Sequence, residues 1–262
     1  MESFLAFWAD AGVDLCFEDE PVDRLAEQLR PLRQAPAPPP APEQPMRAAA
    51  PAGPDIASAI AEARQAAAQA MDLTALEAAI AAFEGCGLKR EGARQAVFSR
   101  GAADAPVMII GEAPGAEEDI QGEPFVGRAG KLLDRMIAAA GLQGRVFITN
   151  TVFWRPPGNR TPTPQEQMIC APFLERAIAL VQPKLLLLSG GAAAKAVLQR
   201  QEGILSLRGR WIDWRSADES LSLPAMPTLH PAFLLRQPAA KKKAWADFLM
   251  LVERLDRPER PA

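Results

Sequence analysis

The run Pro106-Val-Met-Ile-Ile110, followed by the loop Gly111-Glu-Ala-Pro-Gly115, decides the fold of this chain of 262 residues. Two further runs have the same form, Arg145-Val-Phe-Ile-Thr149 and Lys184-Leu-Leu-Leu-Leu188. Short runs that are continuously apolar are typical of strands buried on both faces of a parallel sheet. A fourth strand is expected over Pro224–Thr228.

Segments with helical periodicity alternate with these runs, at Lys131–Ala140, Pro164–Val181 and Ala192–Arg200, and a closing helix is expected over Lys241–Leu255. This order predicts an α/β protein, a three-layer α/β/α sandwich with a central, mainly parallel four-stranded sheet. Ligands of such sheets bind at the carboxyl ends of the strands. The residues that follow the four strands are therefore the first candidates for a functional site.

The N-terminal part of the chain differs in composition. Residues 1–30 carry apolar positions at helical spacing, which predicts a short helical segment. Residues 31–54 contain nine prolines, many of them next to alanine, which predicts a disordered linker. The α/β domain is therefore expected to span residues 55–262.

Two helices are expected at the start of this domain. Asp55–Ala70 is rich in alanine and has helical spacing. Thr74 and Glu77 have the spacing of a capping box, which predicts that a second helix starts there and ends near Glu84.

The charge of the chain is unevenly distributed. Residues 1–83 hold 5 basic and 13 acidic side chains (net −8), whereas residues 84–262 hold 24 basic and 19 acidic ones (net +5). A mildly basic body is compatible with nucleic-acid binding.

The three cysteines are too few and too widely spaced for a disulfide framework, which favours the reducing cytoplasm. No apolar run is long enough to cross a bilayer, so no membrane contact is expected.

Four polar groups follow the four predicted strands. Glu112 lies in the loop after the first strand, Asn150 follows the second, Ser189-Gly-Gly191 the third and His230 the fourth. An acid, an amide and an imidazole at one sheet edge can stabilise charge and hydrogen-bond a planar ligand. His230 is the only histidine of the chain, and a single histidine is more often structural. The prediction of a site therefore depends on the four groups together.

The loop after the first strand gives a specific family resemblance. Its sequence from Gly111 to Gly130, Gly-Glu-Ala-Pro-Gly-Ala-Glu-Glu-Asp-Ile-Gln-Gly-Glu-Pro-Phe-Val-Gly-Arg-Ala-Gly, closely resembles the first motif of family 4 uracil-DNA glycosylases. Arg155-Pro-Pro-Gly-Asn-Arg160, Leu207-Arg-Gly209 and His230-Pro-Ala-Phe-Leu-Leu-Arg236 occur there in the same order. The resemblance covers about residues 80–250. It implies a monofunctional DNA glycosylase that releases uracil from DNA and leaves an abasic site for base excision repair.

The resemblance implies catalytic roles for particular residues. Excision of uracil leaves an anionic base and a cationic sugar, so the site must stabilise both charges and position a water molecule. The family has a catalytic glutamate at the position of Glu112 and a supporting one at that of Glu118. By the same similarity His230 donates a hydrogen bond to uracil O2, and Ala113 belongs to the substrate-binding loop.

Recognition of the base is expected from an amide and an aromatic ring. The carboxamide of Asn150 can donate to uracil O4 and accept from N3–H, a pattern that cytosine does not offer. The resemblance assigns base recognition to Asn150, stacking to Phe125 and a positioning role to Asn159. A turn or helix cap is the alternative for Asn150, and a place in the core is the alternative for Phe125.

DNA contacts are expected from the other motif loops. The arginines that match the family motifs and are suited to bind phosphates are Arg155, Arg160, Arg208 and Arg236. A plain solvated surface role is the alternative for any one of them. Phe233 or Leu234 is the apolar wedge that fills the gap left by a flipped nucleotide, and the sequence leaves the choice open.

The cofactor of many family members is not expected here. The family binds a [4Fe-4S] cluster through four cysteines, whose positions match Phe83, Cys86, Trp154 and Cys170. Four thiolates normally hold such a cluster, and only two are present. We therefore expect no metal and no other cofactor, with Phe83 and Trp154 packed in the place of the cluster.

Two other functions stay open at this stage. A related glycosylase would remove another deaminated base, such as xanthine or hypoxanthine. A non-catalytic module would bind uracil in DNA and dock to a replication protein through residues 1–30. In each case we expect a cytoplasmic monomer whose partner is DNA.

Overall fold

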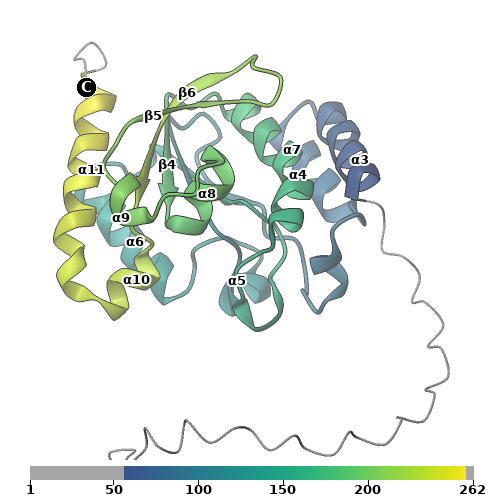
Figure 1. The fold of residues 1–262 in the computed structure, drawn as a ribbon, viewed down its shortest axis with the longest axis horizontal. Coiled ribbons are helices and arrows are strands. Elements are labelled where there is room, and N and C mark those ends of the chain that lie inside the picture. The colour runs from purple at the N-terminus through teal and green to yellow at the C-terminus, as the bar shows by residue number, and fades with distance from the viewer. Residues whose placement is uncertain (1–55, 258–262) are drawn as a thin grey trace, which may run out of the picture. The chain divides into compact units, whose positions relative to one another are not determined.

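The computed structural model describes residues 56–257, which form an α/β domain (Figure 1). The helical segment expected at residues 1–30 and the linker expected at 31–54 lie outside the described residues. Between Ile56 and Arg257, no helix is both long enough and apolar enough to cross a membrane.

A six-stranded sheet in the order β1-β3-β2-β4-β6-β5 forms the centre of the domain. Its four central strands run parallel and correspond to the four predicted runs: β3 (Val146–Asn150), β2 (Val107–Gly111), β4 (Leu185–Ser189) and β6 (Ser222–Thr228). Two antiparallel edge strands complete the sheet, β1 (Ser99–Gly101) beside β3 and β5 (Ile212–Arg215) beside β6. The expected number of four strands was therefore too low. Both edge strands are short and largely not buried, so they lack the apolar run that reveals a central strand.

Helices cover both faces of this sheet (Figure 1). On one face α3 (Ile56–Gln69), α4 (Leu73–Ala82) and α7 (Pro164–Val181) pack in an apolar cluster with alternate residues of the central strands. On the other face α6 (Arg128–Ala139) and α11 (Lys241–Asp256) pack in a second cluster with the remaining residues. Each large apolar side chain that is fully buried stabilises the fold by about 1.5–3 kcal/mol. The predicted three-layer sandwich is confirmed.

Shorter helices and turns connect the layers of the described part of the chain. They are η1 (Gly87–Arg90), α5 (Ala116–Gln121), η2 (Pro157–Asn159), α8 (Gly191–Leu198), α9 (Ile204–Leu207), α10 (Pro231–Arg236) and η3 (Pro238–Ala240).

Helix α7 has the limits that the sequence predicts. Thr163 caps its first turn in a capping box with Glu166, and Pro164 occupies the first helical position, where a proline is tolerated. Gln182 ends the helix in the left-handed conformation.

Helix α4 begins differently from the prediction. Asp72, not Thr74, is its N-cap, and the Asp72 carboxylate accepts a hydrogen bond of 2.7 Å from the backbone of Ala75. The capping box expected from Thr74 and Glu77 was wrong, because Thr74 already lies inside the helix. The helix also ends at Ala82, before the expected limit.

Candidate active site

The last residues of the four parallel strands form a row across the carboxyl edge of the sheet. In this row Gly111 of β2 is paired with Asn150 of β3, and Ser189 of β4 with Thr228 of β6. Two positions earlier in these strands stand Ile109, Ile148, Leu187 and Met226. All four pack in the same apolar cluster as Phe125. Because strand side chains alternate between the two faces, the side chains of the row point to the face on which Phe125 lies.

Asn150 is the most unusual member of the row. Its side chain is buried, with only 1% of the residue exposed, yet neither Nδ2 nor Oδ1 has a hydrogen-bond partner among the described residues. Gly111 lies so close to it that a Cβ at Gly111 would collide with Asn150 Oδ1 and with the ring of Phe125. Leaving a buried polar group unpaired costs about 1–3 kcal/mol. The unpaired amide of Asn150, the backbone of Gly111 and the ring of Phe125 are therefore in close proximity.

The loop that carries Phe125 has an unusual backbone. Phe125 has a φ of 56°, a left-handed value that glycine adopts readily but that L-residues other than asparagine and aspartate rarely adopt. The guanidinium of Arg100 in β1 holds this conformation by donating to the carbonyl oxygens of Pro124 (2.7 Å) and Phe125 (3.1 Å). Gly130 in α6 allows the loop to pass, because a Cβ there would collide with the Phe125 carbonyl group.

Glu118 in α5 holds the same loop from within. One carboxylate oxygen accepts from the backbone of Val126 (3.0 Å) and Gly127 (2.9 Å), and the other accepts from Gly115 (3.1 Å). Both oxygens are therefore occupied by the backbone. The Glu118 carboxylate therefore fixes the backbone of this loop.

His230 lies at the far end of the row as the N-cap of α10. Its Nδ1 accepts a hydrogen bond of 3.1 Å from the backbone of Ala232, so a neutral imidazole here carries its proton on Nε2. Burial, aided by the positive charge of Arg236, lowers the pKa of His230 to about 4. A Cβ at Gly190 would lie 3.0 Å from the Cβ of His230, and the His230 ring lies 5.6 Å from that of Phe125.

Glu112 lies next to this group. Its carbonyl oxygen accepts from the Thr151 hydroxyl at 2.7 Å, and the Thr151 amide donates to Gly111 at 2.9 Å, so the loop is fixed to the end of β3. The Glu112 carboxylate is half-buried and has no ion pair within residues 56–257. Ala113, which follows it, is also half-buried.

Arg155, Asn159 and Arg236 are accessible. Arg155 is half-buried and donates from Nε to Asn159 Oδ1 at 2.7 Å, while Asn159 has a left-handed φ of 57°. Arg236 is exposed at the end of α10. All three side chains are therefore at least partly accessible to solvent.

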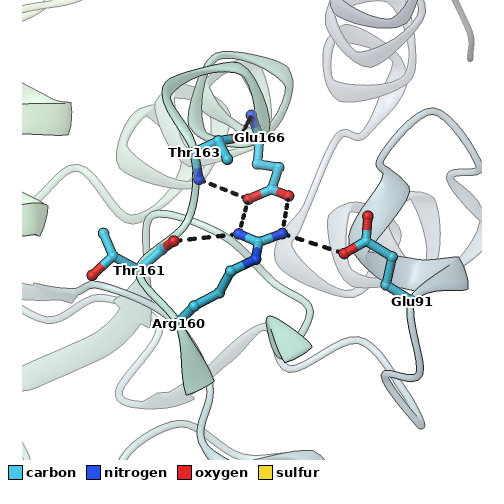
Figure 2. Close-up of polar contacts among 5 residues, drawn as sticks. All are labelled: Glu91, Arg160, Thr161, Thr163 and Glu166. Carbon is cyan, nitrogen blue, oxygen red and sulfur yellow. Dashed lines mark hydrogen bonds and ion pairs between the residues drawn. The ribbon is translucent and has the colours of Figure 1, made fainter. Parts of the chain in front are cut away.

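Arg160 is tied to the protein (Figure 2). Its guanidinium forms two hydrogen bonds with the Glu166 carboxylate, at 2.7 and 2.9 Å, and one with Glu91 at 3.2 Å. These carboxylates raise the pKa of Arg160 above its usual value. Burial alone would raise the pKa of Glu166, but the hydrogen bonds from Arg160 and from the Thr163 backbone outweigh it and lower that pKa. The pairing gives Arg160 a structural role besides any phosphate contact.

Arg208 is also held internally. It forms an ion pair with Asp247, a fully buried residue of α11, and donates to the Lys243 carbonyl oxygen at 2.6 Å. Burial raises the pKa of Asp247 although Thr228 and Arg208 both hydrogen-bond to it. The main structural role of the Arg208 guanidinium is therefore to compensate the buried charge of Asp247.

The two candidates for the apolar wedge differ in exposure. Leu234 is completely buried and packs with Leu229 and Ala244, so it would have to leave the core to enter DNA. Phe233 is half-buried at the edge of this cluster. Of the two side chains, only that of Phe233 is partly accessible.

The four positions of the family cluster lie together in the apolar core. The rings of Phe83 and Trp154 lie 6.4 Å apart, and Phe83 packs edge-on against Phe173 at 5.2 Å. Cys86 and Cys170 are buried free thiols; a hydrogen bond between them lowers the pKa of Cys86 and, with burial, raises that of Cys170. Within residues 56–257 no three histidine, cysteine, aspartate or glutamate side chains gather as a metal site. These residues do not fit a four-thiolate cluster.

Sequence reasoning missed the residues that support the site. Arg100 supports the Phe125 loop and Asp247 supports the end of β6, yet neither belongs to a recognisable motif. Arg100 lies in a short edge strand, and Asp247 looks like one charge among many on a helix. One signal could have revealed Asp247: it is a charged residue at a position that the helical periodicity places in the core.

Comparisons with known proteins identify relatives of this chain. A family model described as the uracil DNA glycosylase superfamily matches residues 98–249. A type-4 uracil-DNA glycosylase of Pyrobaculum aerophilum is 38% identical over 185 residues, which are 69% of this chain and 93% of that protein. Enzymes of the same name from Sulfurisphaera tokodaii (38% identical, 63% of this chain and 77% of that protein) and Thermotoga maritima (39%, 53% and 71%) are also similar. The resemblance to family 4 found in the motifs is confirmed.

Proposed function

The chain belongs to the uracil DNA glycosylase superfamily, and on this premise we propose that it flips deoxyuridine out of DNA and hydrolyses its N-glycosidic bond. The reaction releases uracil and leaves an abasic site for base excision repair. The observation that supports this best is the buried, unpartnered carboxamide of Asn150 beside Phe125. A buried amide without partners is unfavourable in the free protein and becomes favourable when a ligand pairs with it.

Asn150 selects the base in this proposal. Its Nδ2 donates to uracil O4 and its Oδ1 accepts from N3–H, while the ring of Phe125 stacks on the base. Cytosine presents a donor at position 4 and an acceptor at N3, so both hydrogen bonds would be lost when the amide keeps the orientation that pairs with uracil. Two unpaired buried groups cost about 1–3 kcal/mol each, which is enough to reject cytosine.

His230 and Glu112 act on the two charges that develop. The bond between N1 and C1′ breaks, and its electron pair moves onto the base. His230, neutral because its pKa is about 4, donates from Nε2 to O2, where negative charge accumulates. The Glu112 carboxylate faces the cationic sugar and orients the water molecule that adds to C1′.

Release of free bases from synthetic DNA tests this function. Oligonucleotides with a single uracil, hypoxanthine or xanthine are incubated with the protein, and the free base is separated and quantified. We expect release of uracil, with a rate at least about 100-fold lower for Glu112→Ala, the scale of a lost catalytic group. The exposed neighbour Glu117 gives the matched control, because Glu117→Ala should keep the wild-type rate.

Two other results would overturn the proposal. Release of hypoxanthine or xanthine without uracil would mean a related glycosylase with a different substrate. Binding to uracil-containing DNA in a gel shift without release of any base would mean a binding module.

We also propose that this chain works without the family's iron–sulfur cluster. The packing of Phe83 against Phe173 and the apolar surroundings of Trp154 support this, because bulky rings stand where two thiolates are needed. Iron and sulfide analysis of freshly purified, active protein should give far less than one cluster per chain. Stoichiometric iron with visible absorbance would contradict the proposal.

The expected contacts beyond Asn150, Phe125, His230 and Glu112 belong to the same proposal. Arg155 and Arg236 contact DNA phosphates, and Phe233 fills the space of the flipped nucleotide.

The chain acts as a monomer in the cytoplasm, and residues 1–30 bind a protein partner. Light scattering of the full chain tests the monomer, and a dimer mass would contradict it.

A further inference from the structure

Besides Asn150 and the indole N–H of Trp154, Ser189, the last residue of β4, has a buried polar group without a hydrogen-bond partner among the described residues. Only 1% of the residue is exposed, and its Oγ makes no hydrogen bond within the described part of the chain. A buried hydroxyl normally finds a partner, because leaving it unpaired is costly. Ser189 and Asn150 are therefore exceptions of the same kind at the same sheet edge.

The direction of the Ser189 side chain follows from the register of the sheet. Ser189 is paired with Thr228, and Leu187, two positions earlier, packs in the apolar cluster that contains Phe125. Ile148 and Asn150 are related in the same way in β3. The Ser189 hydroxyl and the Asn150 amide consequently point to one face of the sheet, on either side of Gly111.

The neighbours of Ser189 place it beside the imidazole. The next residue, Gly190, donates to the Thr228 carbonyl oxygen at 2.9 Å, and a Cβ added at Gly190 would lie 3.0 Å from the Cβ of His230. Thr228, in the same row, shows the contrast, because its hydroxyl is satisfied by Asp247 at 2.7 Å. Ser189 thus lies between the unpaired amide and His230, with its hydroxyl free.

We propose that Ser189 is a further base-binding residue, whose hydroxyl donates a hydrogen bond to uracil O2 alongside His230. The inference rests on the proposed function. Asn150 takes the O4 and N3 edge of the base, so a donor between Asn150 and His230 faces O2. Negative charge grows on O2 as the glycosidic bond breaks, so this hydrogen bond strengthens in the transition state.

The variant Ser189→Ala tests the proposal through two readouts. The rate of uracil release should fall about 10- to 100-fold, mainly in kcat with little change in KM, as expected for a donor to developing charge. The melting temperature should stay the same or rise, because the alanine removes an unpaired buried hydroxyl.

Ser216 provides a matched control. It is also a buried serine, but its Oγ donates to Asp218 at 2.6 Å and accepts from the Leu221 backbone at 3.0 Å, away from the site. Ser216→Ala should therefore lower the melting temperature and leave the rate unchanged.

Three outcomes separate the possible failures. A wild-type rate for Ser189→Ala would overturn the inference and leave the proposed function intact. A slower Ser189→Ala variant whose melting temperature falls as far as that of Ser216→Ala would make Ser189 structural and would also overturn it. If the wild-type protein itself releases no uracil, the proposed function has failed. The wild-type reaction alone shows this, independently of the Ser189 variant.

Discussion

The ring of Phe125 and the imidazole of His230 lie with their centroids 5.6 Å apart and their planes 31° apart. They come from the loop after β2 and from the turn after β6, two strands that β4 separates in the sheet. The contact therefore joins segments that follow two strands that are not neighbours in the sheet. It makes the environment of the imidazole dependent on the aromatic ring.

Removal of the Phe125 ring should change both base binding and the state of His230. Phe125→Leu loses a stacking interaction of about 1–3 kcal/mol, which corresponds to roughly 5- to 150-fold in kcat/KM. The smaller side chain also lets water reach the imidazole, so the pKa of His230 should rise toward its usual value. Steady-state kinetics combined with a titration of the imidazole measures both effects. An unchanged His230 pKa in this variant would contradict the coupling.

The protonation of His230 can be followed directly, because it is the only histidine of the chain. We expect its nuclear magnetic resonance signals to titrate with a pKa of about 4 and to show the Nε2–H tautomer at neutral pH. In the unfolded chain the imidazole binds a proton at a higher pH, near 6.5. Between these values the unfolded state holds more protons, so the free energy of unfolding contributed by His230 should decrease as the pH falls from 6.5 to 4. Titration near 6.5 in the folded protein would contradict this account.

Glu118 should act through the loop and not through the substrate. Glu118→Gln loses the charge that accepts hydrogen bonds from Gly115, Val126 and Gly127, which we expect to destabilise the fold by about 1.5–3 kcal/mol. Chemical denaturation measures this loss. Glu117→Gln, an exposed neighbour, is the control and should have the stability of the wild type. Equal free energies of unfolding for Glu118→Gln and Glu117→Gln would contradict the loop-positioning role of Glu118.

The two arginines of the Arg155–Arg160 loop should differ in what they support. Arg160→Ala leaves Glu166 and Glu91 without their shared partner, so the melting temperature should fall. Arg155→Ala should keep the melting temperature but weaken DNA binding, with the salt dependence of log K reduced by about one charge. Binding isotherms at several salt concentrations and thermal unfolding separate the two effects. The reverse pattern would mean that Arg160 is the phosphate contact.

The sequence predicts the central strands because both of their faces are buried, with Ile109 on one face of β2 and Ile110 on the other, and such burial leaves continuous apolar runs. It also predicts Asn150 and His230, since they follow such runs directly. It does not predict that Arg208 is paired with Asp247, because that contact joins distant segments through a buried charge. The burial of Leu234 depends in the same way on α11, which packs against α10 only in the folded chain.

Uracil release by Asn150→Ala under single-turnover conditions tests the central claim most directly. The substitution removes two polar atoms that lack partners within residues 56–257, so the melting temperature should not fall, whereas the rate on uracil-containing DNA should fall by about 100-fold or more. Gln143→Ala, at an exposed carboxamide just before β3 at the opposite edge of the sheet, serves as the control and should keep both the wild-type rate and the wild-type stability. An Asn150→Ala variant that releases uracil at the wild-type rate would contradict the claim that this amide reads the base.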